Sequence, residues 1–487
     1  MKRNFFRYSN PVWAILGALL FLLVFSWSTS PLYLVYGIDS PFFEIIGMGI
    51  CEGKVPYVDL FDHKGPLLFF INALGFSVGL GKLGLFLLQW VFFSITLMLL
   101  YAIARIFVTR DGQAFGAVLL ALIPLADFFC EGNQCEEWML PFEAVSLWMA
   151  CKWITDGCCE HRALWSLVHG LCFGVLFCIR PNDGVMWTGG IYFGLFLLWF
   201  ANKQYRTILP NVLMFLVGFA LVCAPLVLYF YLHDAIPDLI YGMFIHNIKY
   251  TADALFTMGG IGMVVIPILI IGVCILLSNR SFDRDTSRNL RYIYIPVLVL
   301  TLLLIGKRDY YHYLIPLTPF VVICFALCKD RGWKAFLWIS CILFAMFSYR
   351  QVKTIVKAWE IRDDLEVLYS QTDSLFDIVP EEERNQIWNY NLSTYVVGEE
   401  HSPHLYSLLG AYIHRGVSPG NAAFVPFEMD YDLVEGYKLQ DKEPKWLLMQ
   451  PEDYFNEDFD YINQNYELIA ATPSEPVCEV RLYRKKD

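Results

Sequence analysis

Long apolar runs separated by short polar segments fill the chain up to about residue 350. Runs of roughly 17–25 apolar residues are long enough to cross the hydrocarbon core of a bilayer as helices. The predicted spans cover residues 12–30, 84–106, 114–129, 139–151, 163–179, 185–201, 207–231, 259–278, 291–306, 313–328 and 333–349. The pattern therefore predicts an α-helical polytopic membrane protein with about 11 transmembrane helices.

After the last predicted span, short apolar runs replace the long ones. The segments QIWNYN, KWLLMQ, YELIAA and VRLYRK are typical of strands, and residues 400–414 and 452–465 have helical character. We expect a membrane domain over residues 1–351. We expect a small soluble α/β domain with four or five strands over residues 352–487.

Composition supports this division of the chain. Of the 487 residues, 57% are hydrophobic, which excludes a water-soluble enzyme. The net charge is −11, and residues 352–487 alone hold about −14, so the membrane part is slightly basic. The acidic tail argues against nucleic acid as a partner. The fourteen cysteines lie mostly inside the spans, where we expect them to fill space as small apolar side chains.

Basic residues predict the orientation in the membrane. With the N-terminus in the cytoplasm, the inner segments hold about 16 Lys and Arg residues and the outer segments about 7. The positive-inside rule favours this arrangement, which leaves the C-terminal domain outside the cell membrane. It requires residues 65–82 to lie along the outer surface as an interfacial helix. If that segment crossed the bilayer, the basic bias would reverse.

Ionisable residues gather at the outer ends of the predicted spans. The four clusters are Asp39 with Glu44, Asp59, Asp62, His63 and Lys64; Glu131 with Asn133, Glu136 and Glu137; Arg180 with Asn182 and Asp183; and Lys307 with Arg308, Asp309, Tyr310, Tyr311 and His312. Charged groups near the bilayer are costly, and those that persist usually mark a functional site. We expect one outer cavity to collect all four clusters.

These side chains suit the transfer of a sugar from a lipid phosphate. A carboxylate takes the proton of the acceptor hydroxyl, for which Asp39 or a loop glutamate is available. Cations stabilise the departing phosphate. The expected cations are Lys64, Arg180, Arg308 and His312. Tyr311 and Tyr313 are placed to pack against the sugar or the isoprenoid.

A span that ends in an acid, followed by G-x-x-P-Y-x-D-x-x-D-H-K-G-P-L at residues 53–67, resembles the GT-C glycosyltransferases. The resemblance covers about residues 12–330. It is closest to bacterial relatives of family 39, which includes the protein O-mannosyltransferases and resembles the aminoarabinose transferases of lipid A. The resemblance implies a polyprenyl-phosphate sugar donor, an inverting single displacement and chemistry on the outer face. Residues 1–351 are then expected to be a GT-C-like catalytic domain.

The resemblance also implies roles for single residues. The catalytic acid of the first loop falls on Asp39, and the second acidic position falls on Glu136 or Glu137. Binding of the donor phosphate and substrate is assigned to Lys64, His63, Arg180, Arg308, Tyr311 and His312.

One departure from the family bears on metal binding. The family often has two adjacent acids in the first loop, whereas Ser40 follows Asp39 here. A divalent metal that needs both carboxylates is therefore not predicted, and we expect transfer without a cofactor.

Structural roles compete with the functional ones at several positions. Asp39 also fits the start of a helix, because Ser40-Pro41 follow it. Asp59 and Asp62 also fit turn positions. His63 also fits a structural partner of its neighbours, and Arg180 also fits an interface anchor.

Two other functions share this arrangement of spans and charges. One is a transporter or flippase for a lipid-linked saccharide, and the other is a polymerase or ligase with a different donor. Transporters tend to show inverted repeats, broken helices and charges at the midplane. Here the charges gather at outer helix ends, which favours a glycosyltransferase. Its acceptor is expected to be a glycan, a lipid or a protein.

Overall fold

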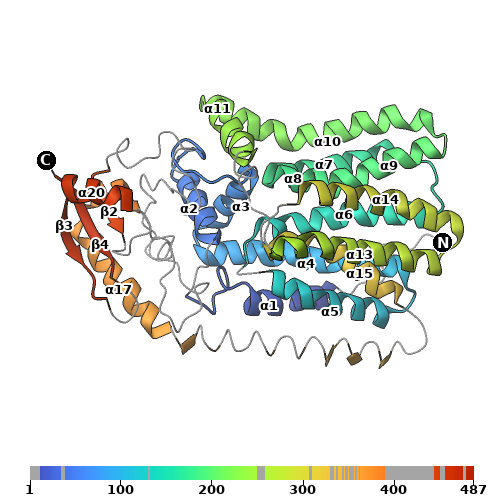
Figure 1. Ribbon diagram of the computed structural model, residues 1–487, viewed down its shortest axis with the longest axis horizontal. Helices are drawn as coiled ribbons and strands as arrows, with labels where there is room; N and C mark the ends of the chain where they lie inside the picture. Colours follow the sequence, from blue (N-terminus) through green and yellow to red (C-terminus); the bar gives the residue numbers. More distant parts are fainter. Residues whose placement is uncertain are drawn as a thin grey trace.

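The computed structural model describes residues 11–34, 39–129, 132–248, 258–305, 310–328, 362–389, 444–449, 456–474 and 479–486, with short pieces of helix between 334 and 360. Figure 1 shows a bundle of long helices that run side by side, with α10 along one edge and α5 along the other. A small sheet lies beyond one end of this bundle.

Six helices among the described residues are long and apolar enough to cross a bilayer, namely α4 (Lys82–Phe107), α5 (Asp111–Phe128), the continuous helix Pro181–Ala201, α10 (Tyr205–Leu232), the apolar part of α13 (Met258–Ser281) and α14 (Arg284–Leu304). The helix Pro181–Ala201 consists of α8 (Pro181–Gly184), the π-helical turn η2 (Val185–Gly189) and α9 (Gly190–Ala201). The prediction of a multi-pass helical membrane protein is thus confirmed.

The expected number of about eleven spans differs from these six because several apolar runs form shorter helices. These are α1 (Pro11–Phe25), α7 (Ala163–Ile179) and the helix formed by η4 (Tyr311–Leu317) and α15 (Thr318–Leu327). The expected span at 139–151 lies in a helix of 21 residues, Cys135–Thr155, that is less apolar than the six. A helix of 17 residues such as α7 measures about 25 Å, just below the ~30 Å core. The expected span at 333–349 lies mostly outside the described residues.

Two short helices cover the end of the bundle that faces the sheet (Figure 1). They are α2 (Asp39–Cys51) and α3 (Pro66–Ser77). With 12 residues, α3 measures about 18 Å and is too short to cross the membrane. The loop between α2 and α3 carries most of the charges of the first cluster, and α6 (Cys135–Thr155) and α7 also contribute to the site described below. This end of the bundle therefore holds the first-loop residues singled out above.

Glycines let α7 and α10 pack backbone against backbone. A Cβ added at Gly170 would lie 2.0 Å from the carbonyl oxygen of Phe215, and one at Gly218 would lie 2.2 Å from that of Leu167. Small residues at helix interfaces permit this close approach, which is a main source of packing energy between helices in lipid. The contact attaches α10, most of whose apolar residues face outward.

Gly170→Ala is expected to destabilise the protein by about 1–3 kcal/mol, because the added methyl group forces the two backbones apart. The measurement is the thermal midpoint of unfolding in detergent. Gly262→Ala in α13 serves as the control, since its Cβ would meet no atom within 4 Å. A Gly170→Ala protein as stable as the Gly262→Ala protein would contradict the packing argument.

The C-terminal region forms a small sheet after α17 (Arg362–Ile378) and the short helix η5 (Glu381–Gln386). The strands are β1 (Ile387–Asn389), β2 (Trp446–Met449), β3 (Tyr466–Ala471) and β4 (Arg481–Lys485), in the order β1-β2-β4-β3. Strand β1 is parallel to β2, and the other pairs are antiparallel. Helix α20 (Asn456–Asn465) precedes β3.

All four predicted strands are present in this sheet. Its small core contains Leu447, Met449 and Tyr483 from the strands and Ile462 from α20. The predicted helix at 400–414 lies outside the described residues.

Candidate active site

The loop between α2 and α3 is fixed against α7 at the position of Lys64. The hydroxyl group of Tyr57 donates to the backbone oxygen of Lys64 at 2.5 Å. The backbone N–H of Gly65 donates to the carbonyl oxygen of Ile179 at 2.8 Å. A Cβ on Gly65 would lie 2.2 Å from the carbonyl oxygen of Cys178, so this approach requires glycine. The end of α7 thus sets the position of Lys64.

The two loop aspartates hold the loop's own backbone. Asp59 Oδ2 accepts a hydrogen bond from the N–H of Val55 at 2.7 Å. Asp62 Oδ1 accepts one from the N–H of Lys64 at 2.8 Å. These contacts correspond to the turn-forming role considered for both residues.

The side chain of Lys64 lies among polar groups and keeps its charge. Its Nζ is 3.0 Å from His63 Nε2, and His63 Nδ1 is 3.7 Å from Asp62 Oδ1. Asn247 Nδ2 donates to the backbone oxygen of His63 at 2.8 Å. Burial lowers the pKa of Lys64, but nearby negative groups, with Asp62 the strongest and Asp39 among them, raise that pKa above its ordinary value. Lys64 is therefore a cation at neutral pH.

Arg180 connects three helices at the same end of the bundle. Its guanidinium group pairs with Glu136 of α6, and its Nε lies 3.2 Å from Asp183 Oδ2 of α8. Its Cζ lies 3.7 Å from the ring centre of Tyr313 in η4. Glu136, Asp183 and Tyr313 are buried, whereas Arg180 is partly exposed. Two carboxylates and an aromatic ring thus fix the guanidinium plane.

His312 lies beside Arg180, in surroundings that disfavour its charged form. Its ring centre is 4.7 Å from that of Tyr313, in an edge-to-face arrangement. Burial lowers the pKa of His312 from 6.5 to about 3; the charge of Asp39 acts in the opposite direction, and those of Arg180 and Lys64 lower it further. A neutral imidazole offers a hydrogen bond rather than a charge, so these surroundings favour hydrogen bonding over charge in the predicted role of His312 at the donor phosphate.

His312→Gln is expected to weaken the loss of stability that the wild type shows at acid pH. Because the pKa of His312 is lowered on folding, its stabilising contribution is complete above pH 6.5 and is lost as the pH falls below that value. Between pH 6.5 and pH 5 the loss is on the order of 1 kcal/mol. The check compares thermal midpoints at pH 7.5 and pH 5 in detergent. Equal drops for both proteins would contradict a buried neutral imidazole.

Asp39 is the first residue of α2 and completes the group. It is partly exposed, and its charge acts on Lys64, on Glu136 and on His312. The start of α2 also favours a negative charge through the helix dipole. The residues that the structure brings together are Asp39, His63, Lys64, Glu136, Arg180 and His312. We call this set the Asp39 cluster.

Glu137 lies outside the Asp39 cluster, in a buried hydrogen-bond network. Its Oε2 accepts from the backbone N–H of Asn133 at 3.0 Å. Asn133 Nδ2 donates to Ser40 Oγ at 2.8 Å and to Asn72 Oδ1 at 2.9 Å, and Ser40 Oγ donates to Glu44 Oε1 at 2.7 Å. The two adjacent acids at the start of α6 therefore face different neighbours. Ser40, which follows Asp39, belongs to this network as well.

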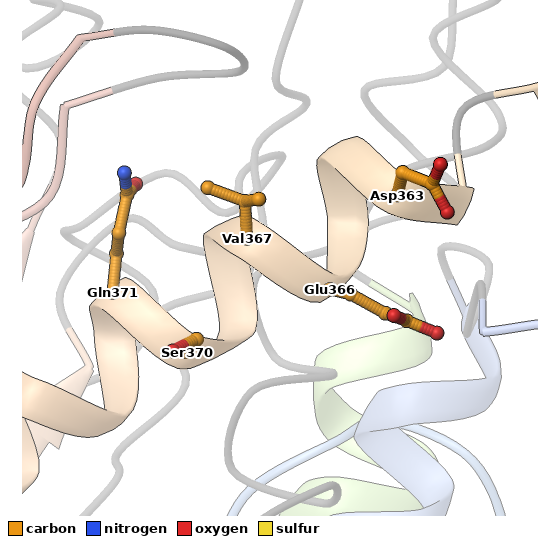
Figure 2. Close-up of a pocket in the computed structure, with 5 residues that line it drawn as sticks. All are labelled: Asp363, Glu366, Val367, Ser370 and Gln371. Carbon is orange, nitrogen blue, oxygen red and sulfur yellow. The ribbon is translucent and has the colours of Figure 1, made fainter.

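The remaining expected residues lie elsewhere. Tyr311 is 48% exposed, and its ring stacks against Phe128 with 6.5 Å between the centres. Arg308 lies outside the described residues. Figure 2 shows a hollow lined by five residues of α17, namely Asp363, Glu366, Val367, Ser370 and Gln371, and none of them belongs to the Asp39 cluster.

Sequence reasoning missed Glu143, two helical turns after Glu136 in α6. Glu143 is fully buried, and neither carboxylate oxygen has a hydrogen-bond partner among the described residues. Asp183 is close enough to Glu143 for the two carboxyl groups to interact electrostatically. Asp183 accepts a hydrogen bond from Trp187 Nε1 at 3.1 Å. An acid inside a predicted span was the available signal. In the part of the chain that the structure describes, no three His, Cys, Asp or Glu side chains form a metal-binding group.

A family model settles where this chain belongs. The model described as the N-terminal domain of the putative competence-induced protein Ccs4 matches residues 15–334. The chain belongs to this Ccs4 family. The Ccs4 match covers the helical bundle and the whole Asp39 cluster. No curated protein matches this Ccs4-family chain.

Two solved structures share the fold of the Ccs4-family chain. One is ArnT from Cupriavidus metallidurans bound to undecaprenyl phosphate, with a TM-score of 0.61, 12% sequence identity and coverage of 98% of each chain. The other is ArnT from the same organism in the apo state, with a TM-score of 0.61, 12% identity and coverage of 97% of each chain. The resemblance to the GT-C class is thereby confirmed for the fold, which is ArnT-like.

Proposed function

We propose that this Ccs4-family protein is a membrane glycosyltransferase. It moves a sugar from a polyprenyl-phosphate donor to an acceptor hydroxyl on the outer face of the membrane, in an inverting single displacement with Asp39 as the base. Residues 1–351 form the catalytic domain. Residues 352–487 lie outside the membrane, opposite a cytoplasmic N-terminus.

One observation carries this proposal. In an ArnT-like fold, Asp39 and Lys64 lie within electrostatic reach of one another, and both are partly exposed. A base and a cation are the two groups that the displacement requires, one for the acceptor proton and one for the leaving phosphate. One of the ArnT structures holds undecaprenyl phosphate, which supports a polyprenyl-phosphate ligand for this fold.

The contacts indicate different roles for the two cations, Lys64 and Arg180. Lys64 Nζ pairs with no carboxylate among the described residues, so its charge is available to the departing phosphate. Arg180 is already paired with Glu136 and Asp183. We assign Arg180 and Glu136 to positioning, since together they fix Tyr313 and the start of α6 beside the substrate.

The experiment uses the purified full-length protein in detergent. It receives polyprenyl-phosphate sugars and hydroxyl acceptors, and the released polyprenyl phosphate is followed over time. We expect release that depends on the acceptor, with the anomeric configuration inverted in the product. Transfer with retained configuration would contradict the single displacement. A polymerase or ligase would instead use a diphosphate-linked donor and ignore the monophosphate.

A transporter or flippase for lipid-linked saccharides is the second candidate, and one observation favours it. Glu143 is a buried acid without a hydrogen-bond partner among the described residues, inside a helix of the bundle. Acids at such depth are common along transport paths. The two functions separate in proteoliposomes, because a flippase moves the intact donor between leaflets and releases no polyprenyl phosphate.

A further inference from the structure

Two pairs of cysteine thiols touch across neighbouring helices. Cys178 Sγ of α7 lies 3.3 Å from Cys223 Sγ of α10, and Cys274 Sγ of α13 lies 3.3 Å from Cys324 Sγ of α15. A disulfide bond is roughly 2.0 Å long, so each pair is within a small shift of bonding distance. The expectation that these residues only fill space therefore leaves out a reaction open to them.

The two pairs differ in the hydrogen-bond acceptors that surround their thiols. Cys274 Sγ lies 3.3 Å from the carbonyl oxygen of Phe320, and Cys324 Sγ lies 3.2 Å from that of Ile270. Each thiol of this pair thus has a backbone acceptor on the facing helix. The hydrogen-bond partner that the described residues give Cys178 is the sulfur of Cys223, and the reverse also holds.

Glycine packing brings the Cys178–Cys223 pair together. Gly170, Gly174 and Cys178 follow one another at intervals of four residues and so lie along one face of α7. A Cβ at Gly174 would lie 2.9 Å from Val222 Cβ, next to Cys223 on α10. Disulfides need Cα atoms about 4.4–6.8 Å apart, so both cysteines must lie where the two helices face each other closely. Helices that meet through glycine satisfy this need.

Position in the chain also distinguishes the pairs. Cys178 precedes Arg180 by two residues and lies at the end of α7 that carries the Asp39 cluster. The distribution of basic residues predicts that this end faces the outside, where disulfides form and persist. Cys274 lies in the second half of α13, towards the predicted inner side.

We propose that Cys178 and Cys223 form a disulfide that ties α10 to α7, whereas Cys274 and Cys324 remain thiols. The two thiols lose two protons and two electrons as the sulfur–sulfur bond forms. These reduce the disulfide of an oxidised thiol–disulfide exchange partner outside the membrane, which leaves with two thiols. The reaction is complete without any other group.

This disulfide would stabilise the helices that hold the Lys64 loop in place. Helix α10 has few buried residues, and Phe230 near its end packs against Tyr57 with 5.7 Å between ring centres. Tyr57 in turn donates its hydroxyl to the backbone oxygen of Lys64. The loop is held by α7 at Gly65 and by α10 through Phe230 and Tyr57. A covalent bond between α7 and α10 therefore fixes the relative position of the two helices that hold it.

The test counts free thiols in the full-length protein. Cells are quenched with acid to stop thiol exchange. The protein is then denatured in the presence of N-ethylmaleimide, which alkylates free thiols, and the modified cysteines among the fourteen are counted by mass spectrometry. If the bond exists, Cys178→Ser releases Cys223, so the count rises by one relative to the wild type. If both residues are thiols, the count falls by one.

The other variants fix the interpretation. Cys223→Ser is expected to raise the count by one, whereas the matched control Cys274→Ser is expected to lower it by one. A peptide that links Cys178 to Cys223 in the unreduced wild type supports the proposal directly. A fall by one in both Cys178→Ser and Cys223→Ser overturns it. The count is made on denatured protein, so it does not depend on glycosyltransferase activity or on the stability of the variants.

Discussion

Asp39→Asn is expected to lower kcat for sugar transfer by about 10²–10⁴-fold, the usual contribution of a general base. The amide has the size of the carboxylate but cannot take the proton of the acceptor hydroxyl. The charge on Asp39 acts on Lys64 less strongly than that of Asp62, so the amide changes the electrostatics around Lys64 only moderately. We therefore expect KM for the donor to change by less than kcat. The measurement is the steady-state release of polyprenyl phosphate in detergent.

Asp156→Asn is the matched control for this variant. Asp156 lies at the opposite end of α6 from Glu136 and forms an exposed pair with Lys152 at 2.5 Å. Its replacement is expected to leave kcat unchanged within a factor of two. If Asp39→Asn retains wild-type kcat in a folded protein, Asp39 is not the base, and the assignment of the reaction to this cluster fails.

Arg180→Met is expected to destabilise the protein by about 3–5 kcal/mol, the largest effect on stability that we anticipate. The substitution leaves Glu136 and Asp183 buried without their cation, and their exposed side-chain fractions are only 2% and 1%. It also removes the guanidinium group from the face of Tyr313. The measurement is the thermal midpoint in detergent, supported by the yield of folded protein.

A charge-neutral combination separates the electrostatic cause from lost packing. Adding Glu136→Gln and Asp183→Asn to Arg180→Met is expected to recover much of the stability, because no unpaired charge then stays buried. Arg288→Met provides the surface comparison, since Arg288 pairs with Asp285 where both side chains are exposed. Its effect is expected to stay below about 1 kcal/mol. Equal losses for Arg180→Met and Arg288→Met would show that the Arg180 pairs are not buried.

The sequence predicted the broad architecture because hydrophobic length and alternation act locally. Apolar runs identify membrane helices, and the four strand segments at the C-terminal end were recognisable from their composition and their spacing. Boundaries were less predictable. An apolar run shows which residues avoid water but not where the helix ends. The expected span 163–179 coincides with α7, whereas the expected span 139–151 is extended at both ends in α6 (Cys135–Thr155).

Part of the membership of the candidate site was predictable from the sequence, but its geometry was not. Charges at helix ends pointed to Asp39, Lys64 and Arg180. Which of Glu136 and Glu137 faces Arg180 depends on the rotation of α6 against its neighbours, and only tertiary packing sets that rotation. The lowered pKa of His312 also depends on packing, because its main cause is burial.

The opposite facing of Glu136 and Glu137 has a consequence for how the protein can diverge. Substitution at 136 removes a buried partner of Arg180 and so acts on the Asp39 cluster. Substitution at 137 removes a hydrogen bond to Asn133, whose side chain donates to Ser40 of α2 and Asn72 of α3. We therefore expect the two adjacent positions to evolve under different constraints. A protein that acquires a new substrate can change residue 136, whereas residue 137 is constrained by the hydrogen bonds that hold α2 and α3.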